Sequence, residues 1–115
     1  MGLDGYLFRE EIGDTSFEVN SLCSGMFSDN GSDGSFRAKC YDDIVFELTG
    51  FTLYEDHAPD EVAEIAKRLR EASRDQVESA IRESLYDDIE MSEFNALVQL
   101  FTEAAEKGCQ YKAWY

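Results

Sequence analysis

The clearest hydrophobic pattern lies near the C-terminal end of the chain, where a helical period gives way to an alternating one. From Phe94 to Ala105, apolar residues recur every three or four positions, which places them on one face of a helix. Ser92 can cap the start of this helix, and Gly108 suits the left-handed conformation that often ends one. Residues 109–115 then alternate between apolar and polar, which predicts a strand.

Two more helices are predicted upstream of this segment. Pro59, the only proline, fits the first position of a helix, whose apolar stripe ends at Ala72. Ser73 and Gln76 then form the S-x-x-Q pattern of a capping box, so a new helix is expected to begin there. Residues 58–108 are therefore predicted to hold three helices.

The first half of the chain has a different period. Alternation in residues 6–10 and 17–23 predicts two strands, and residues 24–35 have the Ser, Gly, Asp and Asn content of a loop. Residues 36–55 are predicted to form a three-stranded antiparallel meander. On this basis residues 1–57 are expected to be mainly β-structure.

The order of these elements predicts one α+β domain over the 115 residues. Strands that come first and helices that come later favour an antiparallel sheet of about five to six strands, with three helices packed on one face. The C-terminal strand is expected to return to the sheet. The predicted core is made of apolar members of the periodic segments: Phe8, Val19, Phe46, Leu48, Leu53, Ile65, Leu69, Ile81, Leu97, Val98 and Phe101.

Net charge narrows the classes of partner. The chain carries 25 acidic and 10 basic residues, for a net charge of −15, while its hydrophobic fraction of 43% is enough for a folded core. Such a surface repels DNA, RNA and anionic membranes and attracts basic proteins, so no direct nucleic-acid or membrane partner is expected. Without an apolar run long enough to span a bilayer or a signal-peptide pattern, the sequence predicts a cytoplasmic protein. Cys23, Cys40 and Cys109 are correspondingly predicted to be buried thiols rather than disulfides.

Catalytic and metal motifs are weak. His57 is the only histidine, and its setting among acidic residues predicts a solvated loop position. No nucleophile or nucleotide-binding motif accompanies it, so we expect a protein without catalytic residues or cofactor. The loop that begins at Asp29 resembles an EF-hand, but Gly31 and Cys40 occupy positions where Ca²⁺ needs oxygen ligands. We therefore predict no metal site.

The acidic residues remain as the candidate functional feature. Within the helical half, Glu64 and Glu78 are expected to pair with Arg68 and Arg82 at i,i+4 spacing. The candidate partner-binding residues are seven acidic residues for which no such pair is predicted, together with one neighbouring aromatic residue. They are Asp42, Asp43, Glu47, Asp56, Tyr86, Asp87, Asp88 and Glu90.

Three functional hypotheses follow from this charge. In composition the chain resembles small acidic proteins of phages and mobile elements, including anti-restriction and anti-CRISPR inhibitors and nuclease-immunity proteins. That resemblance implies an inhibitor that mimics nucleic acid and blocks a basic, nucleic-acid-binding protein or nuclease complex. The alternatives are an acidic domain whose charge serves only solubility or salt adaptation, and a small enzyme that uses carboxylates alone.

Overall fold

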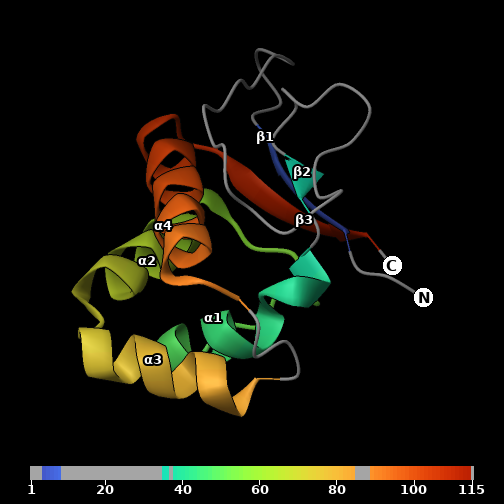
Figure 1. Cartoon of the computed structure of the whole chain (residues 1–115). Helices are drawn as coiled ribbons and strands as arrows, with labels where there is room; N and C mark the ends of the chain where they lie inside the picture. The colour runs from blue at the N-terminus through green and yellow to red at the C-terminus, as the bar shows by residue number, and fades with distance from the viewer. Residues whose placement is uncertain (1–3, 9–34, 37, 85–88, 115) are drawn as a thin grey trace.

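The computed structural model describes residues 4–8, 35–36, 38–84 and 89–114 of the chain. Four α-helices contain most of these residues, and three short strands form one sheet. In chain order the elements are β1 (Asp4–Phe8), β2 (Ser35–Phe36), the 3-10 helix η1 (Ala38–Cys40), α1 (Asp42–Thr49), α2 (Pro59–Glu71), α3 (Arg74–Glu83), α4 (Met91–Glu106) and β3 (Gln110–Trp114). Figure 1 shows the sheet on one side of the molecule and α3 at the end furthest from it, with α2 and α4 between them.

The predicted sheet of five to six strands with three helices is wrong, because the described residues hold four helices and three short strands. The error lies in residues 36–55, which were expected to form a meander but contain α1. A strand would bury Ile44 and Phe46 on one face, whereas the structure buries Ile44 and Val45 and exposes Phe46. The strand predicted at residues 17–23 lies outside the described part of the chain.

Local chemistry explains why α1 is helical. Asp42 and Asp43 occupy its first turn, where carboxylates interact favourably with the helix dipole. The hydroxyl of Thr49 donates to the carbonyl of Val45 at 2.6 Å near the other end. Gly50 then ends the helix with φ 80°, a conformation that other residues rarely adopt.

The boundary between α2 and α3 confirms the predicted capping box. Pro59 is the first residue of α2, as expected. At the start of α3, the backbone N–H of Gln76 donates to Ser73 Oγ at 3.2 Å. The side-chain Oε1 of Gln76 accepts in return from the N–H of Ser73 at 2.8 Å. These reciprocal bonds satisfy two donors that the first turn would otherwise leave open, so the chain can change direction here.

The C-terminal helix and strand are also confirmed, with one change at the helix start. α4 begins after Glu90, so the predicted cap at Ser92 is wrong. Gly108 has φ 70°, as expected for a residue just beyond a helix, and β3 follows it. None of the described helices combines the length and the apolar character needed to cross a membrane.

The buried core gathers residues from every helix. Six predicted core residues are confirmed: Leu53, Ile65, Leu69, Ile81, Leu97 and Phe101. Leu48 and Val98 are partly buried, and Phe46 was assigned to the core wrongly, since 55% of its surface is exposed. The side chains of Phe8 and Val19 lie outside the described set. Cys40 and Cys109 are buried, as predicted, and Cys23 falls outside the described residues.

Tyr111 joins the sheet to the helices. The strand order is β2-β1-β3, with both pairs antiparallel. The Tyr111 ring on β3 lies over Gly5 of β1, where an added Cβ would stand 2.5 Å from the ring. Its hydroxyl donates to the carbonyl of Leu53 at 2.7 Å, and its ring centroid lies 6.5 Å from that of Phe101 on α4. The segment before α2, the sheet and α4 are thus fixed around one side chain.

Candidate functional site

Helix α1 brings together three of the predicted partner-binding carboxylates: Asp42, Asp43 and Glu47. Asp43 and Glu47 are exposed, whereas Asp42 is half-buried. One oxygen of Asp42 accepts from the backbone N–H of Leu53 at 2.7 Å and from the hydroxyl of Thr52 at 3.0 Å. Asp42 therefore holds the segment after α1 against its first turn, while Asp43 and Glu47 face solvent.

The far end of α1 is fixed to α2 through Arg68. The guanidinium donates to the carbonyl of Thr49 at 2.7 Å and lies 5.6 Å from the centre of the Phe51 ring. Its second terminal nitrogen is 3.6 Å from a carboxylate oxygen of Glu64, which confirms the predicted ion pair. With both ends held, the outer face of α1 has a defined position relative to the other helices.

A groove lies between this outer face and α3. We call it the α1–α3 groove, and its volume is about 300 Å³. The described residues that line it are Asp42, Asp43, Phe46, Glu47, Ala80, Glu83 and Ser84. Four of these described residues carry carboxylates and none is a lysine or arginine, so they concentrate negative charge in the groove.

Phe46 gives this groove an apolar surface. It is one of two large hydrophobic side chains that are exposed among the described residues, at 55%, and the other is Tyr54 at 39%. Across from α1, the groove is lined by buried Ala80 and Ser84 and by exposed Glu83 of α3. The groove therefore combines an accessible aromatic ring with carboxylates from two helices.

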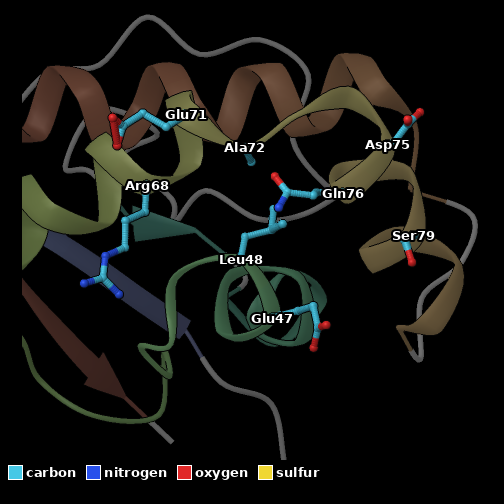
Figure 2. Close-up of a pocket in the computed structure, with 8 residues that line it drawn as sticks. All are labelled: Glu47, Leu48, Arg68, Glu71, Ala72, Asp75, Gln76 and Ser79. Carbon is cyan, nitrogen blue, oxygen red and sulfur yellow. The ribbon is translucent and has the colours of Figure 1, made fainter.

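A second hollow, the α2–α3 junction pocket, adjoins the groove at Glu47. It has a volume of about 480 Å³ and is lined by Glu47, Leu48, Arg68, Glu71, Ala72, Asp75, Gln76 and Ser79. Figure 2 shows Leu48 and Gln76 pointing toward one another, with Glu71 and Asp75 directed away from them. Because Arg68 also lines this pocket, its charge is less one-sided than that of the α1–α3 groove.

Two other predicted site residues, Asp56 and Glu90, are described and do not line the α1–α3 groove. Asp56 accepts from the backbone N–H of Ala113 at 2.9 Å, beside β3. Glu90 is exposed and precedes the first turn of α4. Tyr86, Asp87 and Asp88 lie outside the described residues. The structure thus unites the carboxylates of α1 and separates them from Asp56.

Sequence reasoning missed Phe46 and Glu83 as groove residues. A helical period over α1 would have found Phe46, because Phe46 and Glu47 follow Asp43 at i+3 and i+4 and both lie near it on the helix surface. Glu83 gave no local signal, since only the packing of α3 against α1 brings it to the groove. The predicted partner of Arg82 was also wrong, as Glu78 pairs with Arg74 at 3.0 Å.

His57 is buried, so the prediction of a solvated histidine is wrong. Only 5% of its surface is exposed, and its Nε2 lies 2.7 Å from the carbonyl oxygen of Thr52. Because a carbonyl only accepts, Nε2 carries the proton in this contact. Nδ1 is 3.7 Å from Glu61, beyond hydrogen-bonding distance, and His57 also exchanges two backbone bonds with Tyr111. These contacts give the imidazole a structural role between the α2 start and β3.

Metal-binding chemistry has no counterpart in the described residues, where no three His, Cys, Asp or Glu side chains are placed to hold an ion. Most of the loop that begins at Asp29 lies outside those residues. The carboxylates of the α1–α3 groove produce a negative potential, which attracts cationic groups. No protein-family model, curated protein or solved structure matches the chain.

Proposed function

We propose that this chain is a non-catalytic interaction protein that binds a basic surface of a nucleic-acid-binding partner and blocks it. The observation that carries the proposal is the α1–α3 groove, where the described lining residues include four carboxylates from two helices and no lysine or arginine. A surface that normally receives phosphates presents lysine and arginine, and these are the groups that such a groove attracts.

The charge of the whole chain supports the same proposal. A net charge of −15 on 115 residues opposes compaction through self-repulsion, so folding alone does not account for it. The same field accelerates encounter with a basic partner and makes the association rate sensitive to salt. Inhibition of a nuclease or another defence complex fits this chemistry, in line with the compositional resemblance to small acidic phage proteins.

The proposed setting is the cytoplasm. Cys40 and Cys109 are buried thiols, and a reducing compartment preserves thiols in that form. Nucleic-acid-binding enzymes with basic grooves are found in the same compartment, so inhibitor and target can meet there. The proposal requires no cofactor and no membrane.

Two matched double variants test the role of the groove. Glu47→Gln with Glu83→Gln removes one carboxylate from each side of the groove. Glu55→Gln with Glu106→Gln removes the same charge from exposed residues that do not line it. Because both doubles change the net charge equally, any difference between them reports on position and not on total charge.

The experiment is capture of partners from a host lysate at low and high salt, followed by identification of the retained proteins. We expect a nucleic-acid-binding protein that is retained by the wild type and by the control double, and lost from the groove double. Added duplex DNA or RNA should displace it, since the proposed surfaces compete. Equal retention by both doubles, or retention that ignores salt and nucleic acid, would show that the charge serves solubility instead.

A further inference from the structure

The exposed ring of Phe46 in the α1–α3 groove points to the kind of basic side chain that the groove receives. Buried Ile44 and Val45 already provide the inner face of α1, and Phe46 projects from the other side with 55% of its surface exposed. A single exposed apolar residue is common on proteins and by itself means little. The unusual feature is its setting, in a groove where every charged lining residue that the structure describes is a carboxylate.

We infer that the α1–α3 groove is a receptor for an arginine side chain of the partner, an inference that rests on the proposed function. Arginine has a planar guanidinium that stacks on an aromatic face and donates to carboxylates through two parallel bonds. Lysine offers a compact charge that satisfies the carboxylates but gains less from the ring. The groove supplies both kinds of contact, the ring from Phe46 and the carboxylates from exposed Glu47 and Glu83.

The molecule already contains this combination of groups in its own fold. Arg68 lies 5.6 Å from the centre of the Phe51 ring and 3.6 Å from a carboxylate oxygen of Glu64. There one guanidinium joins a phenylalanine and a glutamate. In the α1–α3 groove, Phe46 lies with Glu47 and Glu83, and a partner would bring the cation that Arg68 provides in the other cluster.

A second copy of this chain is a poor occupant for the groove. Each copy carries −15, so docking one acidic face on another would place like charges together. A neutral apolar segment would cover Phe46 but would bring no positive charge to Glu47 and Glu83. Charge complementarity therefore favours a basic protein segment as the occupant, and the Phe46 ring favours arginine over lysine within that segment.

The test uses two fluorescent peptides of equal length and charge, tetra-arginine and tetra-lysine, each with the same glycine spacers. Binding is measured by fluorescence anisotropy at low and moderate salt. We expect wild-type protein to bind the arginine peptide roughly two- to fivefold more tightly than the lysine peptide, the range expected for a cation above an exposed ring. The Glu47→Gln/Glu83→Gln double should weaken binding of both peptides.

Substitutions at Phe46 distinguish the effect of its aromatic ring on binding from the effect of its apolar surface area. Phe46→Ser and Phe46→Leu should each abolish the preference for arginine, because leucine is apolar but has no aromatic face. Phe46→Tyr should keep it, and Tyr54→Ser, which changes the other exposed aromatic residue, should leave it unchanged. Melting curves establish that each variant is folded.

Several outcomes would overturn the inference and leave the proposed function standing. Equal affinity for the two peptides, combined with sensitivity to the groove double, would show a purely electrostatic surface. A preference for arginine that persists in Phe46→Leu would assign it to something other than the ring. Failure of both peptides to bind would also reject an arginine site, as would a dimer that the Phe46→Ser substitution dissociates. The proposed function would still be tested separately by the lysate experiment.

Discussion

Helices α4 and α1 are both amphipathic, yet the fold uses their apolar residues in different ways. α4 buries Phe94, Leu97, Leu100 and Phe101, and it packs most extensively against α2. α1 buries its inner face but keeps an aromatic residue, Phe46, on its outer face. The comparison teaches that an apolar residue in a helix contributes to the core only if its face meets another element.

Phe101 and Phe46 make this difference measurable, since they are the same residue type in two helices. Phe101 is fully buried and lies beside Tyr111, whereas Phe46 is 55% exposed in the α1–α3 groove. Truncating Phe101 should lower the stability of the fold, whereas truncating Phe46 should change the binding of a partner.

Phe101→Ala should lower the free energy of unfolding by about 3–5 kcal/mol, because it removes a buried ring and leaves a cavity. Such a loss is a large fraction of the stability of a small domain. Urea denaturation followed by circular dichroism measures it. If the variant unfolded at the same urea concentration as the wild type, Phe101 would not be a core residue and the comparison would fail.

Asp42→Ala should cost about 1.5–3 kcal/mol of stability, because its carboxylate accepts two hydrogen bonds, from Leu53 and Thr52. Glu47→Ala is the matched control, with the same charge change at an exposed position of the same helix. The control should change stability by no more than about 0.5 kcal/mol, as is usual for exposed positions. Equal losses in the two variants would contradict the structural role of Asp42.

Phe46→Ser should change the free energy of unfolding by no more than about 0.5 kcal/mol, as is usual for exposed positions. The same variant is expected to lose the preference for arginine described above. Parallel urea titrations of Phe46→Ser and Phe101→Ala give the most direct comparison of the two helices. A destabilisation of Phe46→Ser that approached the Phe101→Ala value would place the ring in the core instead.

The helices that were predicted correctly are the ones with long or punctuated patterns. α4 has 16 residues and α2 has 13, so their apolar stripes repeat over several turns. The α2–α3 boundary is marked by a capping box, whose side-chain bonds depend only on local sequence. Patterns of this kind allow a helix to be predicted from local sequence alone, without knowledge of its tertiary contacts.

α1 was mistaken for a strand because it is short. In eight residues, Ile44, Phe46 and Leu48 fit an alternating period as well as Ile44, Val45 and Leu48 fit a helical one. The acidic first turn and Gly50 were the signals that favoured a helix. Once the period was taken as two, Phe46 was necessarily assigned to the core and the strand count was too high.

The candidate site could be predicted only in part. Asp42, Asp43 and Glu47 are close in sequence, so any local structure keeps them near one another. Glu83 joins them only because α3 packs against α1, and no spacing rule shows that contact. Asp56 was grouped with them by charge alone, whereas its hydrogen bond to the backbone of Ala113 places it beside β3.

The pairing of β1 with β3 has a consequence for how the chain reaches its fold during synthesis. Tyr6 lies opposite Lys112, so the first strand made pairs with the last. Contacts between distant parts of a sequence are slow to form, because the chain between them loses freedom before the contact stabilises it. On the ribosome, β1 must wait until all four helices have emerged before its partner exists. The β1–β3 pair therefore assembles only after the helices have been made, and until then one edge of β1 is open to pairing with other chains.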